Sequence, residues 1–294
     1  MTFSHTAKDR QKITACFDAA AHTYDQHAIM QKEVCTRLLQ NMCCLKMNPR
    51  SILDVGSSTG TAARILEKNY RAQIYCIDLS MHMLKVAAQK KGWFSRQHII
   101  CADAQALPFK DASIDLIFSN LTLQWCPDLL LSFCEFFRVL KPGGALFFTT
   151  LGPDTLKELR QSFAQVDDFT HVNTFKDMHD IGDLLLHARF VDPIIDREDL
   201  TLTYATLQAL IKDLKYTGTH TVLGKQQKGL MGKNKWAQLQ HAYEAFRNAQ
   251  GVLPATYEVI YGHAIKPDLL PIKSKPREPI FIPVGAITRS GAGI

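Results

Sequence analysis

Long apolar runs are missing from this sequence of 294 residues. No stretch approaches the roughly 20 consecutive apolar residues that a membrane-spanning helix needs. The first residues, MTFSHTAKDRQK, are polar where the core of a signal peptide would be apolar. We therefore expect a globular, cytoplasmic protein with no membrane partner. The 46% of apolar residues is enough for a substantial core.

Metal-binding and disulfide patterns are also missing. The eight cysteines form no C-x-x-C pair, and the eleven histidines show no H-E-x-x-H or similar ligand spacing. Because most of the cysteines lie in apolar segments, we predict buried free thiols and no metal. The net charge of +6 is modest and would suit either nucleic acid or an acidic protein partner, so it selects neither.

Short apolar segments that alternate with helical patterns dominate the first half of the chain. Residues 8–47 show apolar positions with a period near 3.6, which predicts an N-terminal helical segment over 1–47. After it, strands are expected at 51–55, 73–78, 98–101, 113–119 and 145–150, with helices at 61–69, 80–91 and 127–140 and a turn at 141–144. Strands that alternate with helices indicate a doubly wound, mostly parallel sheet.

The second half of the chain completes the expected α/β domain, residues 48–265. Helices are predicted at 155–166 and 176–188, an extended stretch at 190–204, a mostly helical insertion at about 205–251 and a last strand at 256–265. This gives seven strands in all. The tail, residues 266–294, is rich in proline, and we expect it to be extended and partly disordered.

The stretch LDVGSSTG (53–60) fits two incompatible chemistries. Read as G-x-S-x-G, it would be the nucleophile elbow of a hydrolase, with Ser58 exposed for attack. Read as a glycine loop after a strand, it would bind a nucleotide cofactor. A hydrolase also needs an oxyanion-hole loop from an earlier strand. Only helical sequence precedes residue 51, so the cofactor loop is favoured.

A cofactor loop of this kind requires an acidic residue at the end of the next strand, and Asp78 stands there. It ends the strand QIYCID, 18 residues after Gly60, where a carboxylate can accept two hydrogen bonds from the vicinal diol of a ribose. Capping of the following helix is the alternative role, but Ser80 already supplies a cap. Because NAD and S-adenosylmethionine both carry such a diol, Asp78 does not separate a dehydrogenase from a methyltransferase.

Three later stretches resemble the class I S-adenosylmethionine-dependent methyltransferases. They are CADAQALPF (101–109), SIDLIFSNLTLQW (113–125) and FFRVLKPGGALFFTT (136–150). The resemblance implies a Rossmann-like class I methyltransferase fold with an N-terminal helical lid, and S-adenosylmethionine as the cofactor. The cofactor-binding residues that it implies are Asp54, Gly56, Ser58, Gly60, Asp78, Leu79, Met83, Asp103, Ala104, Asn120 and Leu121.

The same resemblance implies individual roles at the ends of the strands. Asp103 would bind the adenine amine, with a backbone contact from Ala104, and Asp54 would lie near the methionine amine. Ser119, Asn120 and Leu121 would face the methionine moiety and the methyl acceptor. Taken singly, Asp103 could cap a turn and Asn120 could be a loop amide. Their positions at the ends of successive strands favour a binding site.

The methyl acceptor is indicated by a second set of stretches. Methyltransferases that act on nucleic-acid bases resemble one another in an Asn/Asp-Pro-Pro-aromatic loop, where this chain has SNLTLQW (119–125). That loop, FDAAAHTYDQHA (17–28) and TTLGPDTLKELRQSF (149–163) are instead similar to the malonyl-acyl-carrier-protein O-methyltransferases of biotin synthesis. The similarity extends from about residue 17 to about residue 266. It implies methyl esterification of a malonyl thioester on an acidic carrier protein, with no nucleic acid, by a monomer or weak dimer.

A malonyl carboxylate is already an anion at neutral pH, so its attack on a methyl group needs no general base. We expect the catalytic residues to be Tyr24, Asn120 and Arg160. Tyr24 would close over both ligands, and Arg160 would contact the carboxylate unless it is only a helix-face arginine. Weaker candidates for the same site are Gln26, His27 and Gln124. Lys225, Lys228, Lys233 and Lys235, in or beside the loop KQQKGLMGKNKW, could dock the carrier or be merely solvated.

Two departures from the family pattern raise alternatives. Ser58 stands where glycine is common, and Ala19 stands where F-x-R-A-A carries arginine. A side chain at 58 could crowd the cofactor, so a cofactor-binding paralogue with little activity is one alternative. The other is an arginine hydroxylase, because GPDTLKELR, DMHDIGDLL and VLPATYEVIY also resemble a complex I assembly factor of that activity. No iron triad of two histidines and a carboxylate is apparent.

Overall fold

One seven-stranded sheet organises the protein. The computed structural model describes residues 7–43, 47–222 and 231–268. Its strands are β1 (Ser51–Val55), β2 (Gln73–Asp78), β3 (Gln97–Cys101), β4 (Ile114–Ser119), β5 (Leu140–Leu151), β6 (Val191–Tyr204) and β7 (Leu253–Ile265). Their order across the sheet is β3-β2-β1-β4-β5-β7-β6, and β7 alone runs antiparallel to its neighbours. The predicted α/β fold is confirmed.

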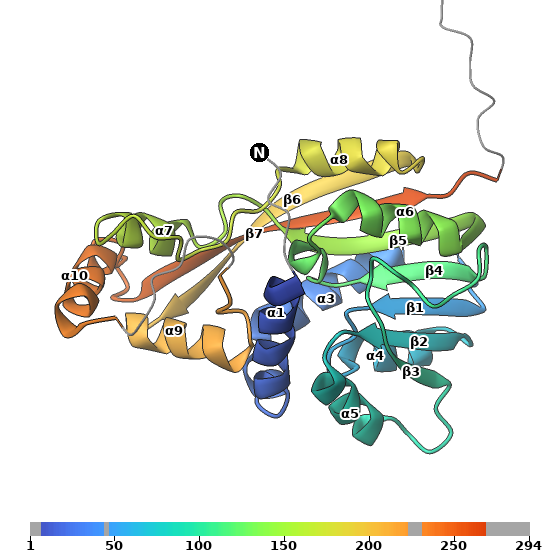
Figure 1. Ribbon diagram of the computed structural model, residues 1–294, viewed down its shortest axis with the longest axis horizontal. Helices are drawn as coiled ribbons and strands as arrows, with labels where there is room; N and C mark the ends of the chain where they lie inside the picture. The colour runs from blue at the N-terminus through green and yellow to red at the C-terminus, as the bar shows by residue number, and fades with distance from the viewer. Residues whose placement is uncertain (1–6, 44–46, 223–230, 269–294) are drawn as a thin grey trace, which may run out of the picture.

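The helices divide into an N-terminal group, a group along the sheet and a group near the ends of β6 and β7 (Figure 1). The expected N-terminal helical segment consists of α1 (Ala7–Ala20), the short α2 (Tyr24–His27) and α3 (Ile29–Met42). Along the sheet lie α4 (Thr61–Asn69), α5 (Met81–Lys90), α6 (Leu129–Val139) and α8 (Met178–His187). The third group is α7 (Lys157–Ala164), α9 (Leu207–Tyr216) and α10 (Lys233–Glu244).

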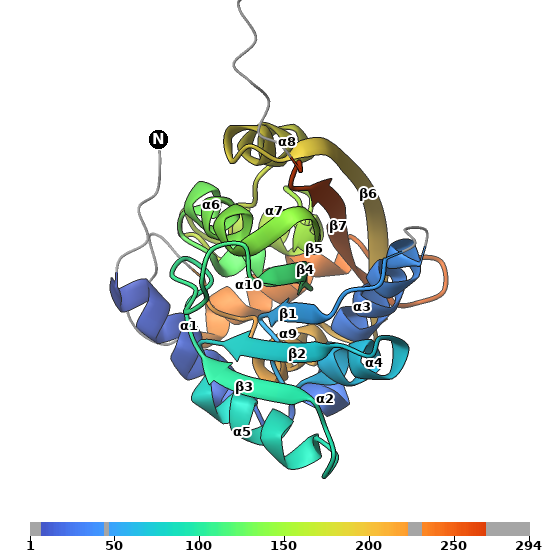
Figure 2. The same ribbon diagram turned by 90° about the vertical axis from the view of Figure 1, so that its right-hand side faces the viewer.

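Alternation along the strands divides the core between the two faces of the sheet. Ile52 packs in a cluster with residues of α3 and α4, whereas the next residue, Leu53, packs in a cluster with residues of α6 and α8. Successive side chains of a strand point to opposite faces, so the nearly continuous apolar sequence of β1 buries both faces. Figure 2, turned by 90°, shows α3 and α4 on one side of the sheet and α6 and α8 on the other.

The two last strands carry the helical insertion. β7 pairs with β5 only from Val259 to Ile265, whereas it pairs with β6 from Leu253 onward. The first half of β7 therefore extends past the parallel strands, and α7, α9 and α10 lie around that extension (Figure 1). The described residues of the predicted insertion at about 205–251 form α9, which lies beside α1, and α10, which lies beside α7. The last strand begins at Leu253, three residues before its expected start.

The KPGG turn predicted at 141–144 is part of β5. The pairing of β5 with β4 jumps from Leu140 opposite Ile114 to Ala145 opposite Leu116, so the intervening residues form a bulge. Gly143 has φ of +71°, a left-handed value that glycine adopts without strain. Residues 141–144 therefore form a local turn inside the strand β5.

None of the helices in the described ranges has the length and apolar character needed to cross a membrane. In those same ranges no three histidine, cysteine, aspartate or glutamate side chains are grouped so that they could hold a metal ion. The seven cysteines described are all free thiols. Of the tail predicted to be extended, residues 269–294 lie outside the described part of the chain.

Candidate active site

The loop after β1 is a tight turn built on left-handed residues. Gly56, Ser58 and Gly60 have φ of +72°, +51° and +77°. A Cβ on Gly56 would lie 1.9 Å from Thr122 Oγ1, so only glycine fits there. Ser58 Oγ contacts Met83 Sδ at 3.4 Å, whereas the nucleophile of an elbow would pair with an imidazole. The geometry favours the cofactor loop over the elbow.

Asp78, at the end of β2, is oriented by two backbone amides. Its Oδ2 accepts a hydrogen bond from Ser58 N at 2.9 Å, and its Oδ1 accepts one from Ser80 N at 2.8 Å. Ser80 in turn caps α5, because its hydroxyl accepts from Met83 N. Burial raises the pKa of Asp78 despite these bonds. The carboxylate of Asp78 therefore connects the loop after β1 with the residues that follow β2.

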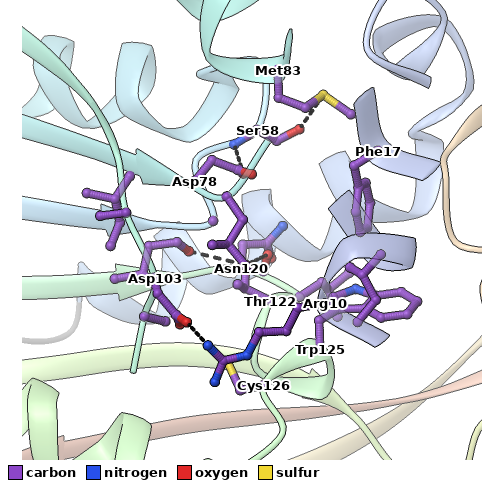
Figure 3. Close-up of a pocket in the computed structure, with 18 of the residues that line it drawn as sticks. Arg10, Phe17, Ser58, Asp78, Met83, Asp103, Asn120, Thr122, Trp125 and Cys126 are labelled. Atoms are coloured by element: carbon purple, nitrogen blue, oxygen red, sulfur yellow. Dashed lines mark hydrogen bonds and ion pairs between the residues drawn. The ribbon is translucent and has the colours of Figure 1, made fainter. Parts of the chain in front are cut away.

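Asp103 follows β3 and is held by a residue from the far N-terminus. Arg10 Nη1 of α1 donates to Asp103 Oδ2 at 2.5 Å, and Arg10 Nη2 donates to Gln105 Oε1 at 2.6 Å (Figure 3). Gln105 N also donates to Asp103 Oδ1. The helix α1 is thereby fastened across the mouth of the site through a charge-assisted contact.

Asp54 is a buried carboxylate in β1, directly before the glycine loop. It is 1% exposed, and its Oδ2 has no hydrogen-bond partner among the residues that the structure describes. Burial, together with the nearby charge of Asp78, raises the pKa of Asp54 to about 7. It borders a small cavity of about 430 Å³ that Lys32 of α3 also lines. A cationic group placed there would satisfy the free carboxylate oxygen.

These side chains converge on one cavity at the carboxyl ends of the parallel strands. It spans about 800 Å³, including the part that is open to solvent. Its walls are Arg10, Ile13, Phe17, Tyr24, Val55, Gly56, Ser58, Ile77, Asp78, Leu79, Met83, Ala102, Asp103, Ala104, Asn120, Leu121, Thr122, Trp125, Cys126 and Pro127. Of the predicted cofactor residues, only Asp54 and Gly60 are not in this wall, and Asp54 borders the adjoining small cavity.

A second, larger cavity adjoins the first. It encloses about 1170 Å³ and lies among α1, α3, α7, α9 and β7. Both cavities are lined by Phe17, Tyr24, Leu121 and Trp125, which form the boundary between them. The rings of Phe17 and Trp125 pack edge to face with centroids 5.5 Å apart. Two ligands, one in each cavity, could therefore meet at an aromatic boundary.

Comparison with known proteins agrees with this geometry. The family model described as a methyltransferase domain matches residues 53–148. The chain is 46% identical to a malonyl-acyl-carrier-protein O-methyltransferase of Gallionella capsiferriformans, over 88% of this chain and 91% of that relative. A second such enzyme, from Coxiella burnetii, is 44% identical over 96% of each chain. This chain belongs to the malonyl-acyl-carrier-protein O-methyltransferase family.

Solved structures share the fold of this family member at low sequence identity. The YcgJ protein from Bacillus subtilis superposes with a TM-score of 0.57 at 19% identity, over 78% of this chain and 97% of that one. A phosphoethanolamine N-methyltransferase of Haemonchus contortus, solved with S-adenosylmethionine, gives 0.51 at 17% identity, over 85% and 57%. They confirm the Rossmann-like methyltransferase fold.

Of the three predicted catalytic residues of this methyltransferase, Tyr24 lies at the boundary of the two large cavities, and Asn120 lines only the first of them. Tyr24 borders both cavities and the small one beside Asp54. A phenol is already neutral at pH 7 with its ordinary pKa, and burial raises the pKa of Tyr24 further, so its hydroxyl can donate a hydrogen bond. Asn120 uses both ends of its amide: Nδ2 donates to Gln31 O, and Oδ1 accepts from Thr149. It joins α3 to the sheet.

Arg160 does not face the boundary. Its Nη1 donates to Pro153 O at 2.8 Å, and its Nη2 donates to the carbonyls of Thr155 and Asn173. It lines neither of the two large cavities. This placement argues against the predicted contact with the acceptor carboxylate, because the guanidinium already binds the backbone on either side of α7. Nothing in the sequence pattern indicated that those carbonyls would be within reach.

The three weaker candidates for the acceptor site, Gln26, His27 and Gln124, lie in different environments in the structure. Gln124 lines the second cavity and donates to Leu121 O at 2.7 Å. His27 instead pairs with Asp213 and stacks on Tyr216, and Gln26 is exposed. Gly60 directly precedes α4, and a Cβ added to it would lie 3.2 Å from the Cβ of Ala87. Close packing of helix and loop, rather than cofactor contact, explains this last glycine.

The structure says little about the lysines of the basic loop as a docking site for the carrier, or about the departure from the family pattern at Ala19. Lys225 and Lys228 lie outside the described residues. Lys233 begins α10, and Lys235 pairs with Asp167 at 2.8 Å. Ala19 is exposed on α1, so the arginine common there would project from the helix rather than fill a gap in the core.

Sequence reasoning missed Arg10, Phe17 and Trp125 as parts of the site. Phe17 and Trp125 lie within stretches that carried the family resemblance, but no local pattern shows that they meet. Arg10 stands 93 residues from its partner Asp103. Only the position of α1 over the ends of the strands brings the two together.

Ser58→Gly tests whether the serine weakens the loop. Glycine adopts φ near +51° without strain and keeps the backbone amide that Asp78 accepts. We expect the free energy of unfolding to stay equal or rise by up to about 1 kcal/mol, with S-adenosylmethionine affinity within threefold of wild type. Chemical denaturation and calorimetry measure both. The β-branched control Ser58→Val should be destabilised. A large loss of affinity in Ser58→Gly would mean that the hydroxyl itself binds the cofactor.

Asp54→Asn tests the raised pKa. In the folded state the carboxyl holds its proton up to about pH 7, against about 3.9 when unfolded. Folding stability contributed by this proton is therefore lost as pH rises from about 4 to about 7. The amide removes the dependence, so the variant should exceed wild type in stability at about pH 8 by on the order of 1–3 kcal/mol. Urea unfolding at about pH 5 and pH 8 measures this. Parallel pH dependence in the two proteins would contradict the assignment.

Proposed function

We propose that the chain transfers the methyl group of S-adenosylmethionine to the free carboxylate of a malonyl thioester on acyl carrier protein, an early step of biotin synthesis. The observation that carries the proposal is the boundary of Phe17, Tyr24, Leu121 and Trp125, where a cavity bordered by carboxylates meets a large, mostly apolar one. The near full-length relatives of this chain have that activity in their names.

The residues of the first cavity and of the small cavity that adjoins it fit the cofactor. Asp78 faces the cavity with both oxygens fixed by backbone amides, as binding a diol requires. Asp54 offers an unpartnered buried oxygen for an ammonium group, and Gly56 leaves room that a Cβ could not. Asp103 would receive the adenine amine on a carboxylate that Arg10 already orients. When bound, S-adenosylmethionine supplies an electrophilic methyl group on a sulfonium.

The chain's own contribution to the reaction is placement and exclusion of water. The acceptor carboxylate is anionic at neutral pH and attacks without a base. Phe17 and Trp125 shield the boundary, which strengthens electrostatic interactions there and removes the water shell of the nucleophile. Tyr24, whose phenol is neutral at pH 7, can donate one hydrogen bond to the acceptor without accepting a proton. Correct placement of two reactants can contribute about 7–11 kcal/mol.

No particular observation supports either of the alternative functions raised by the sequence, the arginine hydroxylase and the paralogue with little activity. The described residues show no group of three ligands for iron, and the relatives found are O-methyltransferases by name. The alternative of a cofactor-binding paralogue with little activity rested on the expectation that the side chain of Ser58 would crowd the cofactor. In the structure Ser58 directs its hydroxyl to Met83 at the cavity wall, with its backbone amide bound to Asp78.

Methyl transfer to malonyl-carrier protein, malonyl-CoA and free malonate tests the function. Mass spectrometry should detect methyl ester on both thioesters and much less on malonate, and calorimetry should detect S-adenosylmethionine binding. Asp78→Asn, which loses a charged acceptor, should weaken that binding about tenfold or more. Cofactor binding without any methyl ester would favour the inert paralogue. Absence of cofactor binding would exclude both the proposed methyltransferase activity and the inert cofactor-binding paralogue.

A further inference from the structure

The second cavity is far larger than a malonyl group requires. Its roughly 1170 Å³ exceeds that of the cofactor cavity, and its wall is mostly aliphatic and aromatic. At one side it meets the cofactor cavity at Tyr24, Leu121 and Trp125. The same wall includes the exposed residues Lys215 and His220, at and just beyond the end of α9. The cavity therefore connects the reaction boundary with the molecular surface.

One buried polar atom in this cavity lacks a partner. Thr221 is 7% exposed, and its Oγ1 makes no hydrogen bond to any residue that the structure describes. Its position is fixed, because the carbonyl of Thr221 accepts from Asn173 Nδ2 at 2.9 Å. A buried hydroxyl without a partner costs about 1–3 kcal/mol. A ligand amide in the cavity would remove that cost.

The surface end of the cavity carries a positive charge. Lys215 is exposed and lines the cavity. The nearest carboxylate in sequence, Asp213, is already engaged by His27 and Tyr204. Partial desolvation of the ring and the charge of Lys215 lower the pKa of His220 below its ordinary value, which favours the neutral imidazole at pH 7. The charge at the rim therefore belongs to Lys215, and it favours an anionic group on the ligand.

These features describe an elongated ligand with a carboxylate at the reaction boundary, amides along its length and an anion at the surface. We propose that the second cavity is a channel for a phosphopantetheine thioester, in which Thr221 binds an amide of the arm and Lys215 pairs with its phosphate. The inference rests on the proposed function. Carrier protein and coenzyme A both present this group, so the channel would accept the arm from either source.

A matched pair of acceptors isolates the phosphate contact. Malonyl-phosphopantetheine and malonyl-pantetheine differ by one phosphate. Lys215→Gln should raise KM for the first by about threefold to tenfold, while kcat, and KM for the second, stay unchanged. Lys212→Gln is the control, because Lys212 is exposed on the same helix and does not line the cavity. It should behave as wild type with both acceptors.

Thr221→Val, a change of nearly equal shape, isolates the amide contact. It should raise KM about threefold to tenfold for both pantetheine thioesters and leave KM for a malonyl methyl thioester, which has no amide, unchanged. Equal KM values of the wild type for the two pantetheine thioesters would overturn the channel, as would equal effects of Lys215→Gln on both. Failure of the wild type to methylate any malonyl thioester would instead overturn the proposed function.

Discussion

The carboxylate of Asp78 is the point on which the site depends. By accepting the amides of Ser58 and Ser80 it ties the loop after β1 to the start of α5, so the turn and the helix hold each other in place. The turn in turn requires Gly56, because Thr122 occupies the space of a side chain. Asp78 at the end of β2 and Gly56 in the loop after β1 thus fix the shape of the cofactor cavity before any ligand enters. The cost is a concentration of buried negative charge, visible in the raised pKa values of Asp54 and Asp78.

The N-terminal helices connect this rigid part to the rest of the molecule. Asp18 of α1 accepts from Ser80, and Asp25 of α2 accepts from Thr59, so both helices contact the cofactor side. On the other side Thr23 donates to Tyr216 O at the end of α9. The boundary residue Phe17 directly precedes Asp18, and Tyr24 lies between Thr23 and Asp25. A single short segment therefore positions both cavities relative to each other, and its order should depend on the ligands of both.

The sequence predicted the parts of the site that follow from strand periodicity. Asp78 and Asp103 line one cavity because parallel strands end at one edge of the sheet, where the residues that follow them gather; their contact with the cofactor stays a prediction. Arg10 could not be predicted, since its contact with Asp103 arises from how α1 lies across that edge. Arg160 was expected at the acceptor from its charge alone. Its actual partners are backbone carbonyls, whose positions depend on the loops flanking α7 and not on any residue pattern.

The account's central claim is that cofactor and acceptor approach from two cavities that meet at the aromatic boundary. A crystal structure with S-adenosylhomocysteine and malonyl-phosphopantetheine would test it most directly. The account predicts the adenosine beside Asp78 and Asp103, the arm in the second cavity and the malonyl carboxylate between Tyr24 and Trp125. An arm that reached the cofactor by any other route, with the second cavity left without it, would contradict the account.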